Sequence, residues 1–243
     1  MPRARGGTGG LLWPEKCGTR FSQNSGGVWE RGACDSMKKI GMQDFVKFAE
    51  KRRRPFHAGY YSMYSSVYGG IVTDPALMMV PVDDHMVHRG DGVFEAIKCT
   101  GGNVYNMQAH LERLEKSAAA IELRLPKTTR EIGRIIVETV RAGNGRESIV
   151  RLYVSRGPGS FGADPYDCPE AQLYVIITKM DVPFMDKHPE GARVGISRIP
   201  AKHGFFARVK SCNYLQNALM KKEAVDAGLD CMVALQPGGF LAE

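Results

Sequence analysis

Two consecutive amphipathic helices, placed between groups of short strands, constrain the fold of this chain more than any other feature. Leu111, Leu114 and Ala118 begin an apolar stripe at helical spacing. Thr128 and Glu131 then form the capping pattern that starts a second helix. Because the strands and helices come in groups and do not strictly alternate, the sequence predicts an α+β fold.

The expected strands are short, and turns that contain glycine or proline separate them. We expect strands at Ile71–Thr73, Leu77–Val82, Val93–Cys99, Val104–Asn106, Ile149–Arg156, Leu173–Thr178, Arg193–Ile199 and Cys231–Leu235, and a further strand from Phe240 onward. A last helix over Asn213–Ala227 should end at Gly228, a common C-terminal stop. The expected parts are 1–36, a leader; 37–59, an N-terminal helix and extension; 60–180, an N-terminal α+β domain; and 193–243, the start of a C-terminal domain.

The leader, residues 1–36, differs from the rest in being rich in glycine, serine and arginine. It reads as an arginine-rich transit peptide, as a disordered tail, or as sequence upstream of a true start at Met37. We favour the third reading because a helix pattern with Ile40, Phe45 and Phe48 follows Met37.

The net charge of +7 lies in the N-terminal part of the chain. Residues 1–57 hold 12 lysines and arginines against 5 acidic residues, so residues 58–243 are neutral. This distribution argues against a nucleic-acid partner. Six scattered cysteines without a C-x-x-C pair fit the reduced thiols of a cytoplasmic protein, and no apolar run is long enough to span a membrane.

Two motifs favour structural interpretations. Gly157 to Gly162 matches G-x-G-x-x-G, but Pro165 and Pro169 follow at once, so the helix of a dinucleotide site cannot begin there. We expect a loop beside a pocket. The aspartates and histidines of Asp83–His88 could hold a metal, but a turn with hydrogen-bonded histidines is the more common outcome, so no metal is predicted.

Three cations are candidates for chemistry. Arg113 lies beside the apolar helix stripe, as a surface arginine or as a clamp for a phosphate. Arg151 lies mid-strand between apolar residues, and burying it would require an anion such as a substrate carboxylate. Lys210 precedes a helix, where lysines are usually solvated, but a neutral lysine there could form a Schiff base.

Four motifs occur together in a fixed order: H-R-G-D-G-V-F-E from His88, A-H-L-E-R-L from Ala109, K-S-C-N-Y-L from Lys210 and G-F-L-A-E from Gly239. With them, roughly residues 60–243 resemble the class IV aminotransferase family of fold-type IV pyridoxal phosphate enzymes. That family includes branched-chain and D-amino-acid aminotransferases and aminodeoxychorismate lyase. The resemblance implies a two-domain α+β fold and pyridoxal 5'-phosphate as cofactor.

The resemblance also implies roles for individual residues. Lys210 would bind the cofactor covalently and act in catalysis, Arg113 would hold its phosphate, and Glu243 would pair with its ring nitrogen. The residues expected to line the substrate site are Phe94, Arg89 and Arg151.

The implied reaction moves an amino group between a branched-chain or D-amino acid and a 2-oxo acid, in a homodimer. One alternative is aminodeoxychorismate lyase, which releases pyruvate and 4-aminobenzoate. Another is an inactive fragment of such an enzyme, because the family continues beyond the residue that matches Glu243, and the C-terminal domain is therefore expected to be incomplete.

Overall fold

The computed structural model describes residues 21–23, 26, 29–31 and 37–242. The chain forms two compact units, residues 1–48 and 49–243. In the first, β1 (Phe21–Gln23) pairs antiparallel with β2 (Trp29–Arg31), although the sequence predicts no strand there. Helix α1 (Met42–Lys51) ends just before three arginines and Pro55. The rest of the expected leader lies outside the described residues, and the expected domain boundaries stay predictions.

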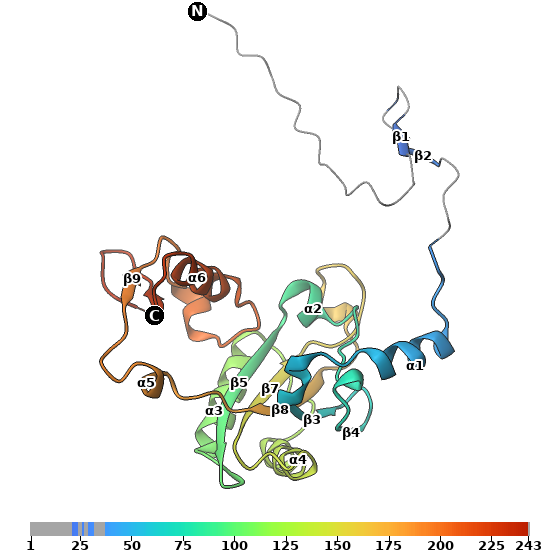
Figure 1. Ribbon diagram of the computed structural model, residues 1–243, viewed down its shortest axis with the longest axis horizontal. Coiled ribbons are helices and arrows are strands. Elements are labelled where there is room, and N and C mark those ends of the chain that lie inside the picture. Colours follow the sequence, from blue (N-terminus) through green and yellow to red (C-terminus); the bar gives the residue numbers. More distant parts are fainter. Residues whose placement is uncertain (1–20, 24–25, 27–28, 32–36, 243) are drawn as a thin grey trace, which may run out of the picture. The chain divides into compact units, whose positions relative to one another are not determined.

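The second unit is built on a six-stranded antiparallel sheet in the order β4-β3-β8-β7-β5-β6 (Figure 1). Strands β5, β7 and β8 pair without a register shift, which makes this the most regular part of the sheet. The strands are β3 (Tyr60–Ser65), β4 (Gly70–Val72), β5 (Gly92–Thr100), β6 (Asn103–Val104), β7 (Ser148–Ser155) and β8 (Gln172–Lys179).

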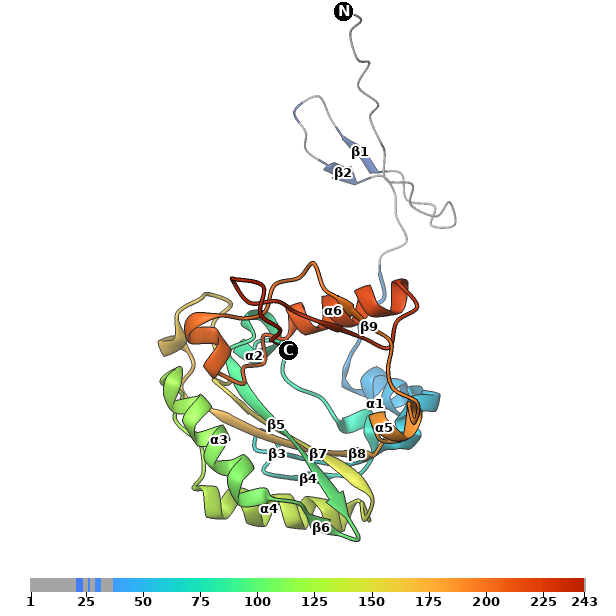
Figure 2. The ribbon, with the colours of Figure 1, turned by 90° about the vertical axis from the view of Figure 1, so that its left-hand side faces the viewer.

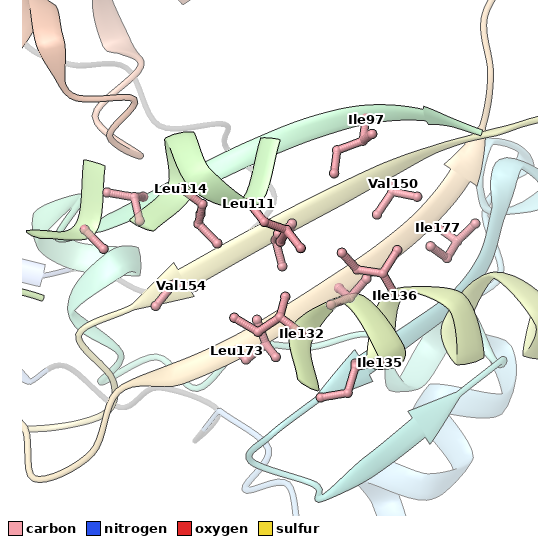
Figure 3. Packing of buried hydrophobic residues seen from close by; sticks show 14 of the residues in the cluster. Ile97, Leu111, Leu114, Ile132, Ile135, Ile136, Val150, Val154, Leu173 and Ile177 are labelled. Carbon is pink, nitrogen blue, oxygen red and sulfur yellow. The ribbon is translucent and has the colours of Figure 1, made fainter. Parts of the chain in front are cut away.

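Helices α3 (Met107–Ala120) and α4 (Thr129–Ala142) cover one face of this sheet (Figure 2). The predicted capping box is confirmed, because the Thr128 and Glu131 side chains each bond the backbone of the other residue. The apolar stripes of both helices meet alternate residues of the strands in one core (Figure 3). Fully buried members of this core include Ile97, Leu114, Ile132, Ile136, Val150 and Ile177.

The opposite face of the sheet carries a row of aromatic side chains. Phe94, Tyr153 and Tyr174 are direct cross-strand neighbours on β5, β7 and β8. Val93 and Glu95 point toward the helices, so strand alternation directs Phe94 away from them. The Phe94 and Tyr153 rings stack with their centroids 5.8 Å apart.

The C-terminal part adds a small βαβ arrangement on the side of the sheet away from α3 and α4 (Figure 2). β9 (Val194–Ile196) pairs in parallel with β10 (Cys231–Val233), and α6 (Leu215–Asp226) lies between them in sequence. Two short elements lie in this C-terminal part: α5 (Phe184–Lys187) precedes β9, and the 3-10 turn η4 (Gly204–Arg208) precedes α6.

Two strand predictions are wrong, and the strand β3 is missed. Leu77–Val82 forms no strand, because Pro75 and Pro81 lack the N–H that a ladder requires, and the 3-10 turn η2 (Pro75–Leu77) forms in its place. The described residues from Phe240 to Ala242 form no strand, and a single bridge joins Leu235 and Leu241 there. Conversely β3 was not predicted, because the buried Ser62, whose hydroxyl donates to the Thr139 carbonyl at 2.6 Å, breaks its apolar pattern.

The short helix α2 (His85–Arg89) and the turns η1 (Pro55–Gly59) and η3 (Pro165–Asp167) complete the second unit. Within the described ranges, no helix is both long and apolar enough to cross a membrane.

Candidate functional site

Lys210 is held on the free edge of β5. The Phe94 N–H donates to the Lys210 carbonyl at 3.0 Å, and the Cys212 N–H donates to the Gly92 carbonyl at 2.8 Å. This edge is open because β6 pairs only with the far end of β5. Residue 92 must be glycine, because a Cβ there would lie 2.8 Å from the Val154 carbonyl oxygen. The backbone of the lysine is therefore fixed by the sheet.

The Lys210 ammonium rests on aromatic rings. Its Nζ lies 4.5 Å from the centroid of the Phe94 ring and 5.7 Å from that of Tyr214. These two rings meet edge to face, with their centroids 5.0 Å apart. Among the described residues, no carboxylate or carbonyl bonds this half-buried ammonium. No described side chain or carbonyl therefore competes with a ligand for this amine.

Arg113, on α3, is oriented by a carboxylate from the sheet. Its Nε and Nη2 donate to the two oxygens of Glu95 at 2.7 and 2.6 Å. His110 Nδ1 lies 2.9 Å from the same carboxylate and must be the donor there, since the carboxylate carries no proton. Nη1 of Arg113 bonds nothing in the described part of the chain, and the side chain is half exposed.

The electrostatics keep this cluster charged. Burial alone would raise the pKa of Glu95, but hydrogen bonds from Arg113 and His110 outweigh burial and hold the pKa below its ordinary value. The pKa of Arg113 is raised, first by its hydrogen bonds to Glu95 and then by the charge of that carboxylate, which together outweigh its partial burial. Arg113 is therefore a fixed cation with one free N–H₂ group.

Arg151 is exposed, so the argument that its burial requires an anion does not apply. Arg151 is on β7, opposite Ala96 of β5, and it shares a sheet face with Tyr153. Burial raises the pKa of the Tyr153 hydroxyl, and the Arg151 charge opposes part of this rise. Arg151 therefore lies on the same face as Phe94, and its role with substrate stays a prediction.

Arg89, at the end of α2, is occupied by backbone carbonyls. Its guanidinium donates to the carbonyls of Gly162 at 3.1 Å, His88 at 3.0 Å and Phe161. It thereby anchors the glycine-rich loop that follows β7. No helix follows this loop directly, and a Cβ on Gly157 would lie 2.0 Å from the Glu170 carbonyl, so the glycine permits close packing. The substrate role of Arg89 stays a prediction.

The aspartates and histidines near α2 are used within the fold. Asp84 caps α2 through the Met86 N–H at 2.9 Å, and it accepts from the Tyr174 hydroxyl at 2.7 Å and from Ser155. His85 Nε2 lies 3.0 Å from the Ser160 carbonyl. This segment is thus a capped helix start with hydrogen-bonded histidines.

The structure connects Lys210, Phe94 and Arg113 through β5, because Phe94 bonds the Lys210 carbonyl and the next residue, Glu95, bonds Arg113. Reasoning from the sequence gave no role to Glu95, His110 or Tyr214, although all three stand inside the quoted motifs. A glutamate between apolar strand residues was the available signal, because a buried carboxylate must find a cationic partner. Glu243, the proposed partner of the ring nitrogen, lies outside the described residues.

Comparison with known proteins gives consistent relatives. The chain is 41% identical to the chloroplastic D-amino-acid transaminase of Arabidopsis thaliana, over 76% of this chain and 48% of that protein. It is 35% identical to a putative branched-chain-amino-acid aminotransferase of Methanocaldococcus jannaschii, over 68% of this chain and 57% of that protein. The chain thus spans about half the length of the curated relatives it matches.

A solved structure of the branched-chain amino acid aminotransferase of T.th. with pyridoxamine 5'-phosphate has the same fold. It superposes with a TM-score of 0.67 at 25% identity, over 76% of this chain and 62% of the other. Residues 92–243 match the family described as amino-transferase class IV. Since that match covers more than half of the sequence, the chain belongs to the class IV aminotransferase family.

Proposed function

We propose that this chain is the lysine-bearing part of a pyridoxal phosphate-dependent aminotransferase. The reaction is transfer of an amino group between a branched-chain or D-amino acid and a 2-oxo acid. The observation that carries the proposal is the Lys210 ammonium, which lies on the rings of Phe94 and Tyr214 without an acceptor among the described residues. The names of the two sequence relatives support this reaction class.

The residues present fit two polar groups of the cofactor, its aldehyde and its phosphate. Its aldehyde requires a primary amine that no other group engages, and the described residues leave the Lys210 side chain without a hydrogen-bond partner. Its phosphate requires a fixed cation, and Arg113 has a free Nη1 group while Glu95 holds the other side of the guanidinium. Its ring nitrogen requires an acid, for which Glu243 stays the proposed residue. The pyridoxamine 5'-phosphate in the related solved structure supports the same cofactor.

Each residue of the site then has a task. When bound, pyridoxal phosphate supplies an electron sink that allows the Cα–H bond of the substrate to break. Lys210 Nζ would hold the cofactor and, once released, would take the proton from the substrate Cα and deliver it to the cofactor carbon that receives the amino group. Arg113 binds the phosphate, and Glu95 keeps Arg113 aimed. Phe94 and Tyr214 shield Lys210 from water, and Phe94, Arg151 and Arg89 line the substrate side. By resemblance to the family, we propose a homodimer.

Turnover with a panel of substrates tests this function. The chain is incubated with pyridoxal 5'-phosphate, 2-oxoglutarate and both enantiomers of valine, leucine and alanine, and each enantiomer of glutamate is measured. Glutamate formation that Lys210→Ala abolishes is the expected result. The matched control is Lys202→Ala, because Lys202 Nζ also lies near the Tyr214 ring, at 5.0 Å from its centroid.

Two outcomes contradict the proposal. In a parallel incubation with aminodeoxychorismate, release of pyruvate and 4-aminobenzoate indicates the lyase if the amino acid panel gives no glutamate. Absence of both turnover and cofactor absorbance indicates a non-catalytic fragment.

A further inference from the structure

Ser117 joins the backbone of Lys210 to α3. The Lys210 N–H donates to Ser117 Oγ at 3.3 Å, and Ser117 is 2% exposed. Alanines occupy the next three positions of the helix, so the local sequence favours small apolar side chains there. A hydroxyl at this buried position needs a hydrogen-bond partner, and the lysine amide is that partner.

The contact closes a ring of five connections through the two proposed cofactor-binding cations. Arg113 and Ser117 lie one turn apart on α3, with a rise of about 6 Å between them. Arg113 is bonded to Glu95 of β5, and the carbonyl of Lys210 is bonded to the N–H of Phe94, the preceding residue of the same strand. The path from Lys210 through Ser117, α3, Arg113 and Glu95 therefore returns to Lys210 through Phe94.

We propose that Ser117 is a positioning residue: its hydroxyl fixes the backbone of Lys210 at a set distance from Arg113, so that one cofactor molecule reaches both side chains. This rests on the proposed function. A ligand that bonds covalently to Lys210 while its phosphate is held by Arg113 depends on the separation of the two residues. Binding of a ligand that uses the phosphate site alone does not depend on that separation. Only the first should be sensitive to Ser117.

Two forms of the cofactor separate these cases. Pyridoxal 5'-phosphate has an aldehyde that reacts with lysine, whereas pyridoxamine 5'-phosphate has an amine and cannot. For Ser117→Ala in the full chain, we expect the dissociation constant of the aldehyde form to rise about 3- to 10-fold, the size of one lost hydrogen bond. The dissociation constant of the amine form should change less than about 2-fold. The absorbance of each ligand during titration reports both values.

Ser62→Ala is the matched control. Ser62 is also a fully buried serine whose hydroxyl bonds a helix, here the Thr139 carbonyl of α4 at 2.6 Å, but it does not contact Lys210. We expect it to lower the free energy of unfolding as Ser117→Ala does, while both ligands bind as in the wild type. Ser117→Thr keeps the hydroxyl and should restore affinity for the aldehyde form. If Ser117→Ala does not fold, Ser117→Cys keeps the volume with a weak acceptor and serves in its place.

The outcomes separate the proposed cofactor-binding function from the proposed role of Ser117. If borohydride fixes the aldehyde form on Lys210 of the wild type, but Ser117→Ala weakens both ligands equally or neither, the proposed function stands and the role of Ser117 is wrong. An effect of Ser62→Ala equal to that of Ser117→Ala also overturns the role. If the wild type binds neither ligand, the proposed function fails and this inference fails with it.

Discussion

The sheet with α3 and α4 differs from the part of the chain after residue 193 in how much apolar surface it buries. The first has a continuous core that runs from β5 through β7 and β8 to both helices. In the described residues of the second, the buried apolar cluster is limited to Ala201, Met220 and Ala234. Val194 and Ile196 of β9 remain 50% and 57% exposed. Burial of apolar surface dominates folding free energy, so the two regions should differ in stability.

The difference teaches where the reactive lysine belongs. Lys210 stands between β9 and α6 in the sequence, inside the weakly buried region. Its neighbour Val209 is nonetheless part of the large core, and its backbone bonds β5 and α3. The lysine is therefore fixed by the more stable region, and opening of the βαβ unit should leave its position unchanged.

The largest expected effect comes from truncating one core residue in each region. Leu114 is fully buried in the large core, and Leu114→Ala should cost about 2 to 5 kcal/mol of unfolding free energy. Met220 is 8% exposed in the small cluster, and Met220→Ala should cost less than half as much. Urea denaturation followed by circular dichroism measures both. Equal costs would show that the two regions are equally stable and would break the comparison.

Acid should weaken the Glu95 cluster in a defined direction. Because the pKa of Glu95 in the folded protein is below its ordinary value of 4.5, its ionised form stabilises the fold above pH 4.5. That contribution is lost as the pH falls through the folded pKa. Glu95→Gln should cost about 1 to 3 kcal/mol near neutral pH, because Arg113 and His110 lose their charged partner.

The pH dependence of that cost is the critical observation. The difference in unfolding free energy between the wild type and Glu95→Gln should be constant above pH 4.5 and should shrink as the pH falls below that value, as the wild type loses its carboxylate. Denaturation curves at several pH values test this. A difference independent of pH would mean that Glu95 is not ionised in the folded protein.

The smallest effect is on thiol reactivity. Burial raises the pKa of Cys212, beside the lysine, to about 12, and it also raises the pKa of Cys99 in the large core. Thiolates react and thiols do not, so both should resist alkylation by iodoacetamide at pH 8. Cys231, a half-buried residue of β10, should react before Cys99 and Cys212 because the small βαβ arrangement opens more readily. Mass spectrometry of the labelled peptides gives the order in which the cysteines react. Rapid labelling of Cys212 would contradict a fixed backbone around Lys210.

Local patterns in the sequence predicted the elements with strong periodicity. The stripe from Leu111 to Ala118 and the Thr128 capping box locate α3 and α4, and the apolar runs of β5, β7 and β8 are also confirmed. The predictions failed where a side chain contradicts its local pattern. Ser62 is buried because α4 supplies a carbonyl partner, and no local pattern can reveal that partner.

The site divides in the same way. The motifs identified Lys210, Arg113 and Phe94, which the structure brings together. The motifs could not show that Glu95 occupies two donors of Arg113, because that contact depends on how α3 packs against β5. Arg151 was assessed as a residue that needs an anion to be buried, and it is exposed instead. Which neighbour satisfies a charge is set by tertiary packing.

Mapping the lysine to which the cofactor is covalently bound tests the role of Lys210 most directly. The chain is mixed with pyridoxal 5'-phosphate, reduced with borohydride, digested and mapped by mass spectrometry, with Lys210→Ala and Lys202→Ala in parallel. We predict a single label on Lys210, which persists in Lys202→Ala and disappears in Lys210→Ala. A label on Lys202, Lys221 or Lys222, or none in the wild type, would contradict the assignment of Lys210 as the cofactor-binding lysine.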